Sequence, residues 1–305
     1  MTFVADQLIG EARRRQVRLW VDSTGKLQFA GDAQALDDRF VMLLRAQEQP
    51  IAAKIGGRSR DRWLRRLTAD EAGHALLYLI PAAGAGPNTY RPMAAVAPAG
   101  LRIEAVLTPG REERFGEAPF TDVGALADRI AEHILGNADR PFAVLGHSTG
   151  GLVAREVTRR LAGSTSEQRA LFVAGAMPPH LVAEPGPDPS DEELLSYLQA
   201  WQGTPAALLD DPGFLRTFLP TLRADLRLFH SCRRVLDPAD RVGVPMTVLG
   251  GRQDDTAPRG VCEAWLPWSA GPFTVRMVDG GHFFPVTAAS EVLAEVARAL
   301  DVAAR

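Results

Sequence analysis

The sequence predicts an α/β fold in two parts, a large domain on a mostly parallel sheet and a small N-terminal αββαα domain. From about residue 60, short apolar runs alternate with helical patterns, which is typical of a sheet with helices on both faces. One stretch, about 178–236, interrupts this alternation with helical patterns alone. Residues 1–57 carry a separate pattern of their own. A chain of 305 residues is long enough for such a pair of unequal domains.

The small domain is predicted from hydrophobic periodicity and turn residues. The expected elements are a helix over 2–15, a strand over 17–22, a second strand beginning with 27–29, a helix after Asp32 and a short helix over 51–55. The apolar face of the second helix is expected to comprise Leu36, Phe40, Leu43 and Leu44. Pro50 is expected to end that helix because it lacks an N–H donor.

The large domain is expected to span 74–305, after a linker and lead-in over 58–73. Continuous apolar runs predict strands that are covered on both faces. These runs occupy 75–80, 101–107, 142–145, 170–174, 246–249 and 273–278. Helical patterns between them include 123–135 and 152–161.

The helical stretch at about 178–236 has clear helix starts. Ser190 and Glu193 fit a capping box, and Asp211 before Pro212 begins another helix with a wide apolar face. The stretch is either an additional helical layer or a lid over an active site. Its place in the chain favours the lid.

Composition excludes several functional classes. The formal net charge is −3, and the arginine clusters lack the interleaved aromatic residues of a nucleic-acid surface, so no nucleic-acid partner is expected. No apolar run approaches the length of a membrane helix, and the N-terminus lacks the pattern of a secretory signal. Two cysteines, Cys232 and Cys262, make no disulfide framework. We therefore expect a cytoplasmic protein without membrane contact.

The pentapeptide from Gly146 to Gly150 places Ser148 between glycines. A short apolar strand over 141–145 precedes it, and a helical run that begins at Gly151 follows it. This strand–turn–helix arrangement resembles the nucleophile elbow of the α/β-hydrolases, in which the serine hydroxyl is exposed above the sheet.

A serine nucleophile needs an adjacent base and an acid that orients the base. In the α/β-hydrolase fold the chain order is serine, acid, histidine, and the histidine follows the last strand. His282 has that position. The acid should follow the preceding strand, where Asp254 is favoured and Asp255 is the second choice. His147, next to the serine, is expected to pack or hydrogen-bond locally.

The oxyanion hole should use two backbone amides. One is the amide of Thr149, directly after the serine. The other should come from the loop over 81–86, whose small residues let the backbone approach a substrate closely.

Several further blocks resemble the type II thioesterases that accompany nonribosomal peptide and polyketide synthases. These blocks are 63–66, 88–94, 109–114, 203–205, 218–220, 223–225 and 280–284. The resemblance implies Ser148, Asp254 and His282 as a triad, with amides of Ala83 and Thr149 around the oxyanion. It also implies an acyl or aminoacyl thioester on the 4'-phosphopantetheine arm of a carrier protein as substrate, with no metal and no cofactor.

Residues 1–57 resemble a different family, the tubulysin-synthetase (TubC) type of N-terminal docking domain, over 8–9, 17–21 and 25–27. That resemblance implies that the strand of Leu27, Gln28 and Phe29 accepts the C-terminal tail of a partner synthetase by strand addition. The alternative is an accessory subdomain that stabilises the hydrolase or makes homodimer contacts.

The expected reaction is hydrolysis of carrier-bound thioesters through a serine acyl-enzyme. One alternative within enzymes is a product-releasing or cyclising thioesterase, or an acyltransferase between carriers. An alternative from another class is a docking adaptor without catalysis.

Overall fold

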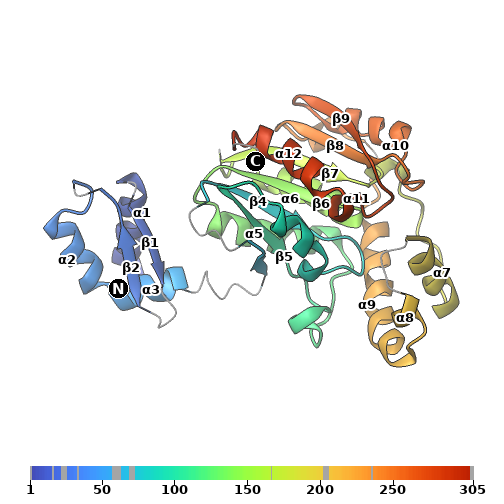
Figure 1. Ribbon diagram of the computed structural model, residues 1–305, viewed down its shortest axis with the longest axis horizontal. Helices are drawn as coiled ribbons and strands as arrows, with labels where there is room; N and C mark the ends of the chain where they lie inside the picture. Colours follow the sequence, from blue (N-terminus) through green and yellow to red (C-terminus); the bar gives the residue numbers. More distant parts are fainter. Residues whose placement is uncertain are drawn as a thin grey trace. The chain divides into compact units, whose positions relative to one another are not determined.

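The computed structural model describes residues 2–15, 17–21, 26–32, 34–56, 63–68, 73–165, 167–201, 206–234 and 236–302. Internal contacts divide the chain into two compact units, Met1–Arg62 and Trp63–Arg305 (Figure 1).

The N-terminal unit has the predicted order of helix, two strands and two helices. Its elements are α1 (Thr2–Arg14), β1 (Arg18–Val21), β2 (Leu27–Ala30), α2 (Asp38–Ala46) and α3 (Glu48–Gly56). β1 and β2 form an antiparallel hairpin in which Arg18 lies opposite Ala30. Buried residues of α1, β2, α2 and α3, together with Val17 just before β1, share one core. It comprises Ala5, Leu8, Ile9, Ala12, Val17, Leu27, Phe40, Leu44 and Ile51.

Three expectations for this unit need correction or fall outside the structure. The apolar face expected for the second helix is smaller than predicted. α2 begins at Asp38, where the Asp37 carboxylate caps it, so Leu36 precedes the helix. Leu43 lies within the helix but is 37% exposed. Pro50 does not end α2, because it lies in the first turn of α3, where an amide has no helical partner to lose. Of the linker and lead-in expected over 58–73, residues 58–62 and 69–72 lie outside the described residues, whereas Leu64–Arg66 form a strand.

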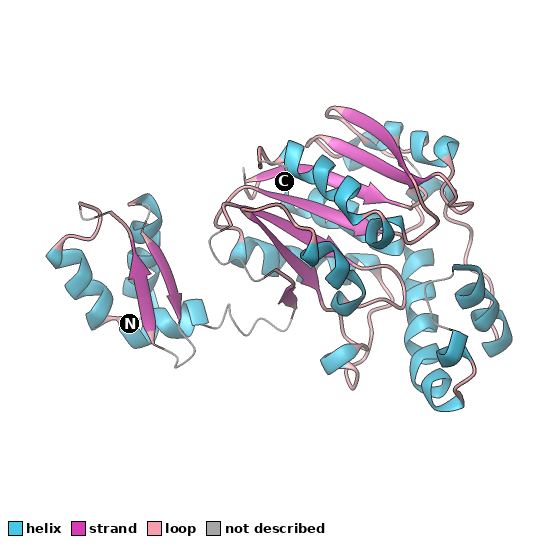
Figure 2. Cartoon of the chain, in the orientation of Figure 1, coloured by secondary structure: helices cyan, strands magenta, loops and turns pink. Residues whose placement is uncertain are grey.

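The large unit is built on a seven-stranded sheet in the order β3-β5-β4-β6-β7-β8-β9 (Figure 2). Its strands are β3 (Leu64–Arg66), β4 (Ala75–Ile80), β5 (Leu101–Val106), β6 (Phe142–His147), β7 (Gln168–Ala174), β8 (Met246–Gly251) and β9 (Phe273–Val278). Neighbouring strands from β5 to β9 in this order are parallel, as predicted. β3 was not predicted, and it pairs antiparallel at the edge.

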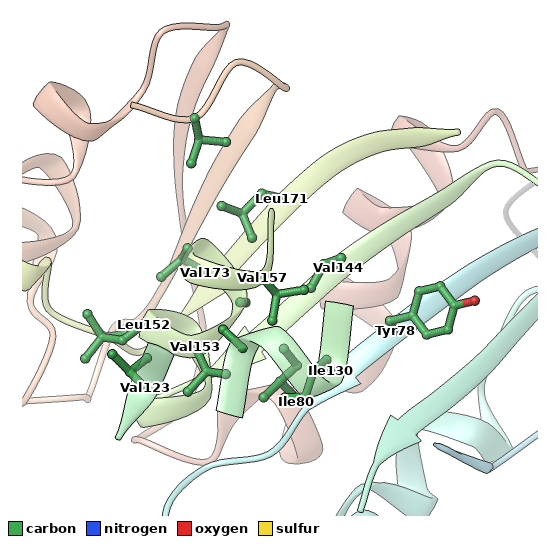
Figure 3. Packing of buried hydrophobic residues seen from close by; sticks show 14 of the residues in the cluster. Tyr78, Ile80, Val123, Ile130, Val144, Leu152, Val153, Val157, Leu171 and Val173 are labelled. Atoms are coloured by element: carbon green, nitrogen blue, oxygen red, sulfur yellow. The ribbon is translucent and has the colours of Figure 1, made fainter. Parts of the chain in front are cut away.

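Helices cover both faces of this sheet. α5 (Val123–Asn137) and α6 (Thr149–Leu161) share one apolar core with the side chains of β4, β6 and β7 that point toward these two helices. Figure 3 shows Val123 and Ile130 of α5 and Val157 of α6 in this core. α4 (Arg91–Ala95) and α12 (Ala289–Ala299) share the second core, on the alternate side chains of the same strands.

The stretch predicted as helical contains α7 (Asp191–Trp201), α8 (Ala206–Leu209) and α9 (Pro212–Ser231), drawn in gold in Figure 1. The capping box at α7 is formed as predicted: Ser190 N–H donates to Glu193 Oε2, and Glu193 N–H donates to Ser190 Oγ. Buried leucines of α7 and α9 make a separate small cluster, which consists of Leu194, Leu198, Leu219 and Leu222. No helix in the described part of the chain has the length and apolarity to cross a membrane.

Phe40→Ala tests the core of the N-terminal unit. Phe40 is 2% exposed, so its truncation should destabilise this unit by about 3–5 kcal/mol. Hydrogen exchange should rise across the helices and hairpin of residues 2–56 in this variant. Leu43→Ala, on the exposed side of the same helix, should leave exchange unchanged. Equal effects of both variants would contradict the assigned helix face.

Candidate active site

Ser148 lies at the turn between β6 and α6, with φ 54° and ψ −125°. A positive φ is strained for a residue with a side chain, and the neighbouring glycines explain how the turn is accommodated. A Cβ at Gly150 would collide with the carbonyl oxygens of Ile80 and Pro81, and one at Gly146 would collide with the backbone of Gly150. Close packing of the helix start against the end of β4 therefore fixes the position of the Ser148 hydroxyl.

Ser148, His282 and Asp254 form one chain of hydrogen bonds. The distance from His282 Nε2 to Ser148 Oγ is 3.0 Å, and that from His282 Nδ1 to Asp254 Oδ2 is 2.9 Å. Of the two candidate acids, Asp254 is buried and makes this contact, whereas Asp255 is exposed. The structure thus brings together the three residues that the sequence singled out.

The Asp254 carboxylate is held by more than His282. Thr256, which no sequence pattern singles out, donates its N–H and its hydroxyl to Asp254 Oδ1 at 3.0 and 2.6 Å. Burial raises the pKa of Asp254, but the hydrogen bonds from His282 and Thr256 outweigh it and hold this pKa below its ordinary value. The carboxylate is therefore ionised at neutral pH and can orient the histidine.

The loops that carry Asp254 and His282 are joined to each other through their backbones. Gln253 N–H donates to Gly280 O at 3.0 Å, and Gly280 N–H donates to the Gln253 side chain. Arg252 N–H donates to Val278 O at 2.8 Å, at the end of the last strand. Because these loops follow the adjacent strands β8 and β9, the sheet itself sets the distance between Asp254 and His282.

His147 is completely buried and links three segments, as well as packing locally as expected. Its Nε2 is 2.8 Å from the backbone oxygen of His282, which can only accept, so this nitrogen carries the proton. Its Nδ1 then accepts from the Tyr90 hydroxyl at 2.8 Å, and Tyr90 Oη accepts Ala82 N–H at 3.0 Å. The backbone of His282 is thus tied to the loop over 81–86. Sequence reasoning missed Tyr90, which lies 57 residues from its partner.

Ala83 and Thr149 both line one pocket, which is open to solvent and encloses about 400 Å³. Among the described residues, neither amide donates a hydrogen bond to a protein acceptor. The side chains around the cavity are mostly apolar, and its lining residues from α9 are Asp225 and Leu228. These two N–H groups, close to Ser148 in the chain or across the pocket, can donate hydrogen bonds to a substrate oxygen on which negative charge develops.

The strand of Leu27, Gln28 and Phe29 is β2 of the N-terminal unit. Side chains already bind one end of its backbone: Leu27 N–H donates to Glu48 Oε1 at 3.3 Å, and Leu27 O accepts from Arg45 Nη1 at 2.9 Å. A strand added here would need to displace these two side chains or begin at Phe29.

Other reactive groups do not form a second centre in the described part of the chain. No group of three or more metal-ligating side chains occurs among these residues. Cys232 and Cys262 are buried free thiols, and burial raises the pKa of Cys262 to about 11. Neither thiol is therefore activated as a nucleophile.

The fold and the site define an α/β-hydrolase, with a serine, an aspartate and a histidine in the chain order of that fold. The thioesterase domain family matches residues 75–300, so the chain belongs to this family of hydrolases that act on thioesters. Its similarity to the type II thioesterase BorB from the borrelidin biosynthetic cluster has a TM-score of 0.70 at 29% identity. This similarity covers 79% of this chain and 98% of BorB. The resemblance to type II thioesterases is confirmed.

Two curated relatives extend the comparison. A probable cadicidin biosynthesis thioesterase of Streptomyces griseus is 33% identical over 240 residues, which cover 78% of this chain and 66% of that protein. The AMB antimetabolite synthetase AmbE of Pseudomonas aeruginosa is 34% identical over 297 residues, which cover 94% of this chain and 13% of AmbE. The chain thus spans 66% and 13% of the lengths of these relatives. The AmbE match extends beyond the large unit into the N-terminal unit.

His147→Gln should change how stability depends on pH. Burial, together with the nearby His282, lowers the pKa of His147 to about 3, whereas an unfolded histidine titrates near 6.5. Below about pH 6.5 the unfolded chain binds a proton that the folded chain does not, so folding free energy is lost as the pH falls. From pH 7 to 5 the wild type should lose about 2 kcal/mol more than His147→Gln in urea unfolding. Parallel losses in the two proteins would show that His147 is not buried in its neutral form.

Proposed function

We propose that the protein hydrolyses acyl or aminoacyl thioesters carried on the 4'-phosphopantetheine arm of carrier proteins, through an acyl-enzyme on Ser148. The observation that carries this proposal is the hydrogen-bonded chain from Ser148 through His282 to Asp254, beside two free amides. Membership in the thioesterase family supports the type of bond that is cleaved.

The geometry suits general-base activation of the serine. His282 Nε2 accepts the proton of Ser148 Oγ as the oxygen attacks the thioester carbonyl, and Nδ1–H stays with the Asp254 carboxylate. The amides of Ala83 and Thr149 donate to the oxyanion of the tetrahedral intermediate. The C–S bond then breaks, and His282 gives its proton to the departing thiolate.

Deacylation repeats the same steps with water. His282 takes a proton from a water molecule that attacks the ester carbonyl on Ser148. The second tetrahedral intermediate then breaks its C–O bond to Ser148 Oγ, which takes the proton back from His282, and the acid is released. Residues of this chain suffice for every proton transfer in this scheme, so it requires no metal and no organic cofactor.

The names of the similar proteins support a thioester on a carrier protein as the substrate. The solved relative BorB is a type II thioesterase of a biosynthetic cluster, and the Streptomyces griseus relative is a biosynthetic thioesterase. The mostly apolar cavity beside the amides suits an acyl group. The stretch over 178–236 serves as the lid, since Asp225 and Leu228 of α9 form part of the cavity wall.

The N-terminal unit serves as a docking domain for the C-terminal tail of a partner synthetase at β2. The similarity of AmbE, a synthetase, to 94% of the chain supports a function alongside synthetases. Homodimer contacts through the same unit are the alternative. We expect the reaction to take place in the cytoplasm, where the two unpaired thiols stay reduced.

A panel of acyl- and aminoacyl-carrier proteins, with product masses measured, tests the reaction. Free acid as the main product supports hydrolysis. A cyclic product, or an acyl group moved to a second carrier without free acid, would replace hydrolysis with release by cyclisation or with transfer. Unchanged turnover in Ser148→Ala would show that the reaction does not proceed through an acyl-enzyme on Ser148.

Asp254→Asn and Asp255→Asn form a matched pair of neighbouring variants. Asp254→Asn should lower kcat by about 10³–10⁴-fold, because an amide neither favours the required His282 tautomer nor stabilises its charged form. Asp255→Asn should stay within about twofold of the wild type, since its side chain is exposed. Steady-state hydrolysis of a small acyl thioester measures both, and an equal loss in the two variants would refute the assignment of the acid.

Removal of residues 1–57 separates catalysis from recruitment. The shortened chain should hydrolyse small acyl thioesters at the rate of the full chain, within about twofold, because all residues of the mechanism belong to the large unit. Its binding to C-terminal peptides of carrier-bearing synthetases should fall below detection by calorimetry. Equal binding constants for both chains would exclude the docking role.

A further inference from the structure

The loop that carries Ala83 has a distinctive pattern of bound and free amides. Ala82 N–H donates to Tyr90 Oη at 3.0 Å, and Gly84 N–H donates to Asp225 Oδ2 at 2.6 Å. The Ala83 amide between them has no acceptor among the described residues. Two anchored peptide groups therefore flank one free donor, and they limit the rotation of the peptide that contains it.

Asp225 and Arg111 make the anchor on the side of α9. Asp225, which is 3% exposed, uses its second oxygen to accept from Arg111 Nη2 at 2.7 Å. Arg111 Nη1 in turn donates to Ala85 O at 2.9 Å. The carboxylate and the guanidinium thus hold the backbone on either side of the Gly84–Ala85 peptide, and each charge is neutralised by the other.

Packing shows how closely the loop lies against α9. Gly84 has a φ of +70°, and a Cβ at this position would lie 2.7 Å from Phe218 Cζ. One turn before Asp225 on the same helix, Thr221 Oγ1 donates to Gly110 O at 2.8 Å, next to Arg111. The loop, the segment of Arg111 and α9 are thus joined by hydrogen bonds and by direct contact.

We propose that Asp225 and Arg111 are positioning residues that hold the Ala83 amide in the direction of the substrate oxyanion. The inference rests on the proposed function, in which this amide is an oxyanion donor. A preorganised donor stabilises the transition state because it needs no reorientation during the reaction, and a displacement of about 1 Å is enough to lose much of that effect. Pairing with Arg111 also keeps the Asp225 charge from opposing the oxyanion.

Asp225→Asn tests this role, with Arg227→Gln as the matched control. Asp225→Asn should lower kcat on a small acyl thioester by about 10- to 100-fold and change KM by less than about threefold. Arg227 is two residues further along α9, pairs with Asp188 at the exposed surface and does not contact the loop, so Arg227→Gln should keep the wild-type kcat. Asp225→Asn leaves the charge of Arg111 unpaired, which can prevent folding. In that case the same kinetic constants are measured in the double variant Arg111→Met/Asp225→Asn, which buries no unpaired charge.

A tetrahedral inhibitor separates positioning from a general structural defect. An acyl trifluoromethyl ketone adds to a serine and forms an oxyanion, so its Ki should rise by the same factor by which kcat/KM falls. Binding of the corresponding non-electrophilic methyl ketone should be unchanged. Wild-type kcat in the folded variant, or a fall in kcat/KM without any rise in the inhibitor Ki, would overturn the inference. A wild-type protein without thioesterase activity would instead refute the proposed function.

Discussion

The close contact between the start of α6 and the end of β4 is the constraint on which the site depends. Gly150 lies so near the carbonyl oxygens of Ile80 and Pro81 that no Cβ fits there. This contact accompanies the strained turn at Ser148, and Thr149, the next residue, lines the pocket. The contact also places the loop after β4, which carries Ala83, beside the turn of Ser148. Serine and both amides are thus fixed by one junction between a strand and a helix.

A second set of contacts ties the remaining groups to this junction. His147, directly before the serine, binds the backbone of His282 on one side and Tyr90 on the other. Because Tyr90 also binds Ala82, His282 and the loop over 81–86 share one buried hydrogen-bond network. On the opposite side of the loop, α9 supplies Asp225. The site is therefore held by groups from both cores and from the helical stretch over 178–236.

Sequence patterns predicted the elements and residues that depend on local order along the chain. Ser148 and His282 follow strands directly, so strand recognition was enough to place them. Asp254 and Asp255 are adjacent, and only the direction of each side chain, set by Thr256 and by burial, separates them. Gly84 and Asp225 are 141 residues apart, and no local pattern indicates a pairing at such a distance. The prediction that Pro50 ends α2 is wrong, because a proline breaks the interior of a helix but is tolerated in its first turn, where Pro50 lies in α3.

Phosphonylation by a fluorophosphonate tests whether Ser148 is an activated nucleophile. An activated serine attacks phosphorus, displaces fluoride and retains the phosphonyl group, which intact-mass and peptide mass spectrometry can locate. We expect a single phosphonyl group on the peptide that contains Ser148, with thioester hydrolysis lost in proportion to its occupancy. Modification at another residue, or full thioesterase activity in protein whose Ser148 is phosphonylated, would contradict the account.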